Sequence, residues 1–212
     1  PQMGKKAKLV CIPTTAGTGS ECTPFTIISD ANTGMKWPLI GYEMMPEMAI
    51  IDADNMMKLP PRATQASGYD VLTHAVEAYV STFATEYTDG FCKEATKMVF
   101  DYLPRAYRSA FKGAKADPVA REKMADASAL AGIGFANAFL GMNHSLAHKI
   151  GAEFHVPHGR TNAILLPYVI RYNGTKPEKP GVWPKYNYYK ADEKYAELAR
   201  LIGLKFNTVE EG

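Results

Sequence analysis

The chain has 212 residues, enough for one sizeable hydrophobic core or for two small lobes. Hydrophobic residues make up 46% of it and charged residues 22%, and the net charge of +2 gives no sign of a nucleic-acid partner. No apolar stretch is long enough to span a bilayer and no signal peptide is visible, so we expect no membrane partner and a cytoplasmic location.

The cysteines and the chain ends add two expectations. Cys11, Cys22 and Cys92 are odd in number and form no Cys-x-x-Cys pair, which predicts free thiols that pack as small buried hydrophobes. The sequence opens at Pro1 just before an apolar strand and ends at Gly212 just after a helical pattern. We therefore expect an excerpt from a longer polypeptide.

The strand signals lie in the first sixty residues. Residues 8–12 predict a short buried strand, and residues 24–30 and 48–52 predict two more. Between the first two strands, a segment rich in Gly, Thr and Ser predicts a loop, and the sequence ANTG at 31–34 predicts a turn.

Helical periodicity begins near residue 64 and continues to about residue 173. We predict helices near residues 64–81, 88–112, 118–140, 142–153, 158–172 and 191–203. Asp117 and Pro118 predict the start of the third helix, Gly141 its end, and Gly203 the end of the last helix. Residues 174–190 hold three prolines and predict an irregular surface segment. The fold class is thus an α/β piece over residues 1–60 followed by an all-α piece over residues 61–212.

Residues 14–21, with the sequence TTAGTGSE, are a candidate phosphate loop. The loop follows a strand and offers small residues, backbone N–H groups and hydroxyls, which can hold an anionic phosphate. It matches neither the Walker A pattern nor Gly-x-Gly-x-x-Gly. The alternative from the pattern alone is a flexible turn between two strands.

Ionisable residues with metal-ligand spacing follow the loop. Asp70 and His74 are four residues apart in a predicted helix and so share one face. His144, His148, His155 and His158 cluster further on, and we expect at most three of these four to bind an ion. One carboxylate with neutral imidazoles suits Fe²⁺ or Zn²⁺ better than Mg²⁺ or Ca²⁺. The alternative for Asp70 is a helix-capping role after Gly68.

Longer segments around these residues resemble a known family. TTAGTGSE, IIDA, GYDVLTHAVEAYVS and FANAFLGMNHSLAHKIGAEFHVPHGRTNAILLP are similar to the iron-containing (group III) alcohol dehydrogenases. TPFTIISD, FANAFLG and AHKIGAEFHVPHG look most like the C-terminal alcohol dehydrogenase part of bifunctional aldehyde-alcohol dehydrogenases. The resemblance implies a partial chain of the dehydroquinate-synthase-like fold of that family.

The resemblance implies roles for individual residues. The metal ligands of the family match Asp70, His74, His144 and His158, and His148 matches a histidine proposed to relay protons near the nicotinamide. The family pattern gives His155 no fixed role. The positions that match the family's cofactor-binding residues are Thr14, Thr15, Thr18, Ser20, Ile27, Lys36 and Leu59.

The resemblance further implies reversible hydride transfer between NAD(H) and a small aldehyde or alcohol, with acetaldehyde and ethanol as the expected pair. The expected ion is Fe²⁺, with Zn²⁺ as the alternative, and the expected assembly is a homo-oligomer that can form helical filaments. The family residues that choose NAD over NADP would lie upstream, so the choice stays open. Phe135, Phe139 and Leu140 are candidates for an apolar wall that limits substrate size, or for ordinary helix core.

Three rival functions remain open. A glycerol or diol dehydrogenase fits the same motifs. A dehydroquinate-synthase-like cyclase would need several basic residues for an anionic substrate, and the segment offers mainly Lys149 and Arg160. The third rival is a structural filament module without catalysis.

Overall fold

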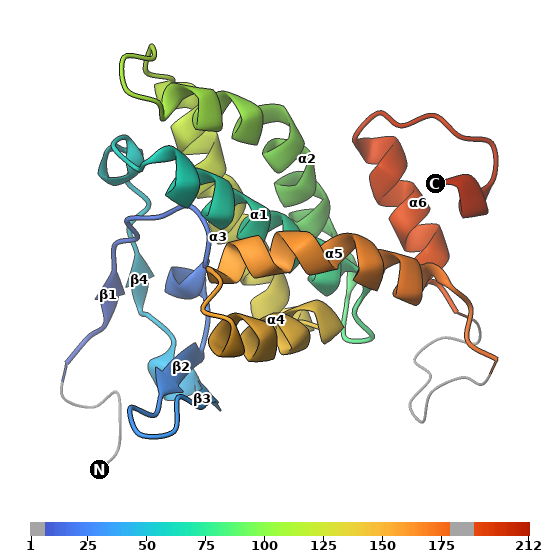
Figure 1. Cartoon of the computed structure of the whole chain (residues 1–212), viewed down its shortest axis with the longest axis horizontal. Helices are drawn as coiled ribbons and strands as arrows, with labels where there is room; N and C mark the ends of the chain where they lie inside the picture. The colour runs from blue at the N-terminus through green and yellow to red at the C-terminus, as the bar shows by residue number, and fades with distance from the viewer. Residues whose placement is uncertain (1–6, 179–188) are drawn as a thin grey trace.

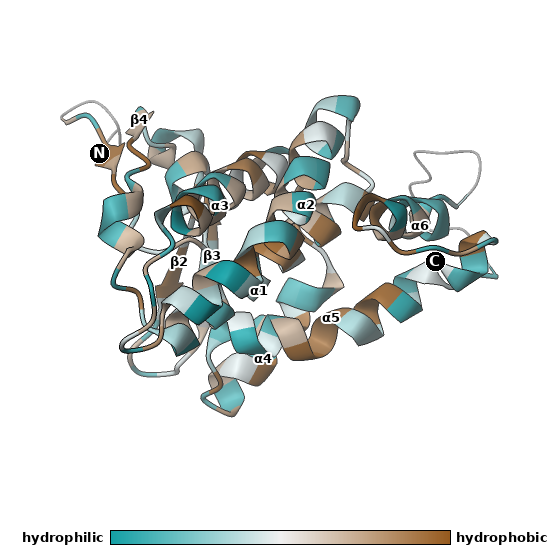
Figure 2. Cartoon of the chain, turned by 90° about the horizontal axis from the view of Figure 1, so that it is seen from above, coloured by the Kyte–Doolittle hydropathy of each residue, from teal (hydrophilic) through white to brown (hydrophobic). Residues whose placement is uncertain are grey.

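The strands and the helices occupy opposite parts of the chain. The computed structural model describes residues 7–178 and 189–212, apart from the Lys36 side chain. All four strands precede residue 50 and all six α-helices follow residue 60. In Figures 1 and 2 the strands lie at one end of the molecule and α6 lies at the other end. The fold class predicted from the sequence, an α/β piece followed by helices, is confirmed.

The strands form two separate pairs. β1 (Val10–Cys11) runs parallel to β4 (Met48–Ala49), and β2 (Phe25–Ser29) runs antiparallel to β3 (Lys36–Ile40). The predicted strands 8–12 and 48–52 are therefore shorter than expected, because each pairs along only two residues. The hairpin between β2 and β3 turns at Asp30, whose carboxylate accepts the backbone N–H of Asn32 at 2.8 Å, as the predicted turn requires.

β3 is a strand that the sequence did not predict. Pro38 lies at its centre, opposite Ile27, and proline cannot donate a hydrogen bond to a partner strand. Since β3 pairs only with β2 among the described residues, the missing donor falls on an edge and costs little. A proline within a short apolar run hides such a strand from pattern reasoning.

The helix predictions agree with the structure to within a few residues. The observed helices are α1 (Pro61–Val80), α2 (Glu86–Ser109), α3 (Pro118–Ala138), α4 (Met142–Glu153), α5 (His158–Gly174) and α6 (Ala191–Leu201). The predicted irregular segment 174–190 overlaps α5 at its last residue, Gly174, and residues 179–188 of it lie outside the described residues.

Local signals account for most of the helix ends. The Asp117 side chain caps α3 by accepting the Ala120 N–H at 3.0 Å, and Pro118 takes the first helical position, as predicted. Gly203 follows α6 with a φ of 90°, also as predicted. The prediction that Gly141 ends α3 is wrong: α3 stops at Ala138, and Gly141 precedes the first turn of α4.

The core lies between α1, α2 and α3, and α1 also packs on α5. All seven residues from Thr73 to Tyr79 of α1 are buried, so its neighbours cover several sides of the helix. Figure 2 shows hydrophobic and hydrophilic segments alternating along the helices, as expected where one side of a helix packs inward. Cys92 lies in this core as predicted, whereas Cys11 and Cys22 are only half-buried.

One glycine determines how closely α5 approaches α1. A Cβ atom at Gly159 would lie 1.9 Å from the carbonyl oxygen of Ala66, a distance that no side chain tolerates. Glycine at the start of α5 therefore allows backbone contact between the two helices. Because His158 directly precedes this glycine, the contact also sets where that histidine lies. No helix within the described residues is both long and apolar enough to cross a membrane.

Candidate metal centre

Three helices bring one carboxylate and three imidazoles together. α1 carries Asp70 and His74 one turn apart, and both are buried. His144 lies in the first turn of α4, and His158 is the first residue of α5. The Nε2 atoms of His74, His144 and His158 lie 4.0, 3.7 and 3.4 Å from Oδ1 of Asp70. The Asp70 carboxylate is thus the common neighbour of the three rings.

The donor set suits a transition-metal ion. Asp70, His74 and His144 each offer a ligand atom within 4.8 Å of the other two, and all three residues are buried. His158 extends the set from the open side, with 34% of its side chain exposed. Three imidazole nitrogens and one carboxylate oxygen match the mixed ligands of iron and zinc sites. These four residues therefore fit the kind of ion that the sequence led us to expect.

Aromatic packing holds two of the rings in place. The His74 ring stacks on Phe135 of α3 with 4.4 Å between centroids and on His144 with 4.6 Å. The two imidazoles lie nearly parallel, with 13° between their planes. The Nε2 atoms of both rings lie within 4.0 Å of Oδ1 of Asp70. Packing by Phe135 also keeps His74 away from water, since 4% of the residue is exposed.

Sequence reasoning missed a second group of polar residues that contacts the candidate ligands. The Asn162 amide of α5 donates to Oδ1 of Asp70 at 2.7 Å and lies 3.1 Å from Nε2 of both His144 and His158. The Asn143 amide donates in turn to Oδ1 of Asn162 at 3.0 Å.

A carboxylate completes this second group. Glu77 of α1 is buried beside His144 and accepts hydrogen bonds from the start of α4. Spacing could have revealed two members of the group. Glu77 follows His74 by three residues and Asn162 follows His158 by four, so each shares a helix face with a predicted ligand.

Burial and mutual charge shift the pKa values of the cluster in different directions. Burial lowers the pKa of His74 to about 3, so this imidazole stays neutral. Burial opposes ionisation of Asp70, but the neighbouring histidines outweigh it and its net pKa falls below the ordinary value. Burial would also lower the pKa of His144, yet hydrogen bonds to Asp70 and Glu77 raise it overall. A bound cation would compete with a proton for Nε2 of His144.

A largely apolar pocket opens beside the four residues. Its volume is about 480 Å³, which suits a small organic molecule. Phe135, Phe139 and Leu140 form part of its wall, one of the two alternatives for these residues, although Phe135 also belongs to the hydrophobic core. β2 and β3 supply the opposite side. The lining residues are Thr18, Phe25, Thr26, Ile27, Ser29, Pro38, Ile40, Asp70, His74, Phe135, Phe139, Leu140, His144, His148 and His158.

His148 and His155 have different positions. His148 lines the pocket, with its ring centroid 5.0 Å from that of His158 and 6.2 Å from that of His144. His155 is exposed in the turn between α4 and α5, with a φ of 52°, and does not line the pocket. The histidine cluster, which spacing alone did not divide, is therefore divided in space.

The predicted cofactor residues fall into two groups. Thr18 and Ile27 line the pocket, and Thr18 donates a hydrogen bond to the Ser20 hydroxyl at 3.0 Å. Thr14 and Thr15 precede Thr18 in the same loop. The loop packs on α3 at Gly132, where a Cβ on Gly19 would lie 2.7 Å from the Gly132 Cα.

The last two predicted cofactor residues, like Thr14, Thr15 and Ser20, lie outside the pocket lining. Leu59 lines a separate small cavity beneath the loop, and its carbonyl accepts hydrogen bonds from Thr64 and Arg121. Lys36 begins β3 opposite Ser29, which does line the pocket.

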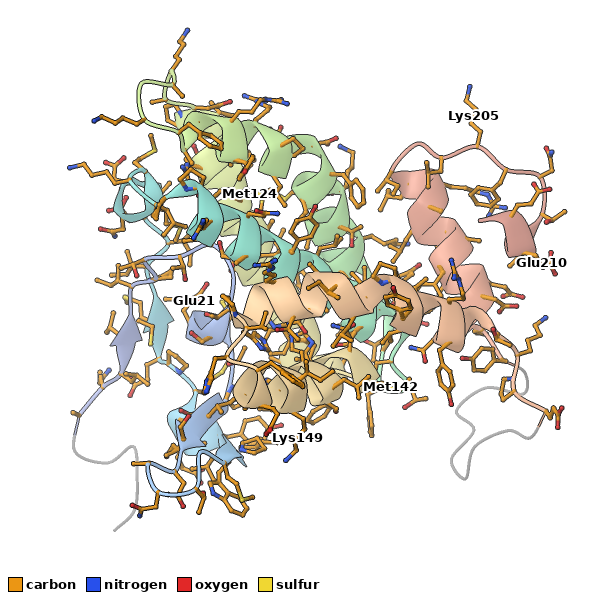
Figure 3. The ribbon with its side chains drawn as sticks, in the orientation of Figure 1. Glu21, Met124, Met142, Lys149, Lys205 and Glu210 are labelled. Carbon is orange, nitrogen blue, oxygen red and sulfur yellow. The ribbon has the colours of Figure 1, made fainter. Side chains whose placement is uncertain are left out.

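Basic residues do not contribute to the described pocket lining. Lys149 and Arg160 are both exposed, and Figure 3 shows Lys149 pointing outward from α4. Among the described residues, the lining therefore offers no lysine or arginine to a multiply charged anion. This disfavours the cyclase reading, which needs several such residues.

Comparison with known proteins agrees with this geometry. Residues 64–212 match the model for the Fe-containing alcohol dehydrogenase family, C-terminal, and residues 1–53 match the model for iron-containing alcohol dehydrogenase. The chain is 58% identical over 212 residues to aldehyde-alcohol dehydrogenase 2 of Entamoeba histolytica, covering all of the chain and 24% of that protein. It thus spans about a quarter of the length of this relative.

Solved structures show the same fold. An iron-containing alcohol dehydrogenase from Thermococcus thioreducens is 33% identical, with a TM-score of 0.82 over all of this chain and 50% of that one. Sulfoacetaldehyde reductase from Bifidobacterium kashiwanohense, solved in complex with NAD+, is 30% identical with a TM-score of 0.75, over 95% of this chain and 54% of that one. The matched domains, their extent and the shared fold lead to one conclusion: the chain belongs to the iron-containing alcohol dehydrogenase family.

Proposed function

We propose that this chain forms the metal- and substrate-binding part of an alcohol dehydrogenase that moves hydride reversibly between NAD(H) and a short-chain aldehyde or alcohol. Acetaldehyde and ethanol are the proposed pair, and the whole protein is proposed to be a bifunctional aldehyde-alcohol dehydrogenase. The observation that carries the proposal is the convergence of Asp70, His74, His144 and His158 on one side of a small apolar pocket.

Asp70 and the three histidines are proposed to hold one Fe²⁺ ion, with Zn²⁺ as the alternative. When bound, such an ion acts as a Lewis acid that stabilises negative charge developing on the substrate oxygen. A site with this ligand set binds zinc more tightly than ferrous iron, so metal supply would decide which ion is present.

The pocket walls would orient the substrate and exclude water. Phe135 and Phe139 present aromatic rings to the pocket, and Phe25 stacks on Phe135 from the strand side with centroids 5.9 Å apart. An apolar wall of this kind favours an uncharged, short-chain substrate over a charged one. His148 lines the same space, and its imidazole is proposed to pass a proton to or from the substrate oxygen.

The cofactor is proposed to bind along the loop of residues 14–21 and the first strand of the hairpin. NAD(H) would supply or accept the hydride. Thr14, Thr15, Thr18, Ser20, Ile27, Lys36 and Leu59 are the proposed contacts, of which Thr18 and Ile27 line the pocket. The NAD+ complex of the related sulfoacetaldehyde reductase supports this cofactor class. The homo-oligomer and the filaments stay predictions from family resemblance, and the cytoplasmic location stays a prediction from the sequence.

The test uses the full-length protein purified without oxygen. We expect elemental analysis to find about one iron or zinc per alcohol dehydrogenase unit, together with NAD-dependent ethanol oxidation. His144→Ala should lose both the metal and the ethanol oxidation. His155→Ala is the matched control, because this histidine is exposed outside the pocket, and it should keep both. Full ethanol oxidation by His144→Ala in metal-free buffer would contradict the proposal.

A further inference from the structure

Glu77 is a buried carboxylate with a concentrated set of partners. It lies on α1 three residues after His74, and 3% of it is exposed. Its Oε1 accepts the backbone N–H of Asn143 at 2.7 Å, and its Oε2 accepts that of His144 at 3.2 Å. The same Oε2 lies 2.5 Å from Nδ1 of the His144 ring. One side chain thus meets both the backbone and the ring of a proposed metal ligand.

These contacts determine which ring nitrogen of His144 carries hydrogen. An ionised carboxylate only accepts hydrogen bonds, so Nδ1 must be the donor toward Oε2. A neutral imidazole has a single N–H, which leaves the lone pair on Nε2. Nε2 is the atom that faces Asp70, at 3.7 Å from Oδ1. Glu77 therefore favours the tautomer whose lone pair points into the proposed metal site.

The backbone contacts fix the ring's attachment point. The first N–H groups of a helix have no partner within the helix, and α4 has no side-chain cap of its own at Gly141. Glu77 supplies the acceptor from another helix and places negative charge at the positive end of α4. Gly141 leaves space for it, since a Cβ there would lie 2.9 Å from Oε1 of Glu77.

We propose that Glu77 is a positioning residue of the metal centre, which sets both the tautomer and the orientation of His144. The inference rests on the proposed function, because it presupposes that His144 binds a metal ion. Glu77 itself would not touch the ion. This positioning role differs from a purely architectural role, in which Glu77 would only attach α4 to α1. The two roles are separable, because only the first makes metal affinity depend on Glu77 in protein that is already folded.

The test is Glu77→Gln in the full-length protein. Glutamine keeps the shape of the side chain but offers one acceptor oxygen and one NH₂ group. Its single oxygen cannot accept both the backbone N–H of Asn143 and the Nδ1–H of His144, which in Glu77 face different oxygens. We expect zinc affinity, measured by competition with a chelator, to fall about 10–100-fold. The visible absorption spectrum of the cobalt-substituted protein should also change, because His144 would hold the ion differently. Circular dichroism identifies the folded fraction, on which both measurements are made.

Glu197→Gln is the matched control. Glu197 also accepts hydrogen bonds between helices, from Tyr79 and Lys93, but it lies outside the pocket lining. Its zinc affinity and cobalt spectrum should equal those of the unaltered protein. Equal zinc affinity in Glu77→Gln and the unaltered protein, within twofold, would overturn the inference.

Two further outcomes keep the inference separate from its premise. If the unaltered full-length protein binds no metal, the proposed function fails first, and the positioning role fails with it. If Glu77→Gln does not fold, a crystal structure of the zinc-loaded unaltered protein decides the question. Zinc on Nε2 of His144 with Nδ1 on Glu77 supports the positioning role, and zinc on Nδ1 overturns it.

Discussion

The two walls of the pocket are built in different ways. The helical wall is buried and cross-linked: Asp70 and His74 are 5% and 4% exposed, and hydrogen bonds join the ligands to Asn162 and Glu77. The strand wall is open: Ile27 and Ile40 of the hairpin are 46% and 62% exposed, and each strand pairs with only one other within the described chain.

The difference shows which part of a pocket needs rigidity. Metal ligands must keep fixed positions, and helices packed on a common core provide them at low entropic cost. A wall that only shapes an apolar space can consist of side chains on a short hairpin. Exposed apolar residues gathered on one side are also typical of a surface that binds another molecule. The predictions below test this contrast, from the largest expected effect to the smallest.

Asp70→Ala should have the largest effect, because it removes the one carboxylate of the proposed ligand set and the acceptor of the Asn162 amide. We expect metal affinity to fall by more than about 100-fold, since even changes behind the ligands cost about 10–100-fold. Competition with a chelator measures it on full-length protein. Ile27→Ala, in the strand wall, is the control and should stay within twofold. A loss of similar size in both variants would remove the contrast between the walls.

Acidification should weaken metal binding through His144. Its pKa lies above the ordinary 6.5 in the metal-free protein because hydrogen bonds to Asp70 and Glu77 outweigh burial. A proton therefore competes with the ion as the pH falls through that raised pKa, with a loss of about tenfold per pH unit below it. His74 does not compete in this range because its pKa is about 3. Metal affinity that stays constant from pH 8 to pH 5 would contradict this assignment.

Gly159→Ala should destabilise the helical wall. The added Cβ meets the Ala66 carbonyl oxygen, so α5 must move away from α1 at a cost of about 1–3 kcal/mol. Gly90→Ala is the matched control in α2, where the added Cβ meets nothing within 4 Å. It should stabilise the protein by about 0.5–1 kcal/mol. Thermal unfolding with excess chelator measures both, and a melting temperature unchanged by Gly159→Ala would show that α5 can shift freely.

Phe139 separates backbone strain from side-chain function. Its φ of 63° and ψ of −179° fall in a region almost restricted to glycine, which costs other residues about 1–3 kcal/mol. Phe139→Gly and Phe139→Ala both remove the ring, but only glycine removes the strain. We expect the glycine variant to be more stable than the alanine variant by about 1 kcal/mol.

Both variants should show a higher kcat/KM for 1-butanol relative to ethanol, because both lose the ring that lines the pocket. An unchanged ratio would remove Phe139 from the size-limiting wall.

The smallest effect on stability is expected at Ile27. Its side chain is half-exposed, so Ile27→Ala should cost less than about 1 kcal/mol, whereas Val71→Ala, at a fully buried position of α1, should cost about 2 kcal/mol. The KM for NAD or alcohol should nevertheless rise several-fold in Ile27→Ala, because the residue lines the pocket. Steady-state kinetics measures the KM, and denaturant unfolding measures the loss of stability in both variants. Equal stability losses at the two sites would mean that the strand wall is as firmly packed as the helical one.

Local signals in the sequence determined most of the helical part. Apolar periodicity and capping residues such as Asp117 act within a few residues, so the helices could be predicted to within a few positions. The spacing of Asp70 and His74 likewise fixes their common face. β3 could not be predicted in this way, because its only support is pairing with β2 across a turn, and Pro38 masks the pattern.

Only the tertiary structure decided how the ligands meet and what lies behind them. Spacing alone did not separate His144, His148, His155 and His158, although the family resemblance gave them different roles. The packing of α4 and α5 on α1 placed two near Asp70, one in the pocket wall and one at the surface. Spacing places Glu77 and Asn162 on the same helix faces as His74 and His158, but their hydrogen bonds join residues 67 and 92 positions apart along the chain. The sequence by itself determined the residues able to bind a metal, because spacing along a helix is a local property. Their convergence depends on contacts between helices, which no local pattern encodes.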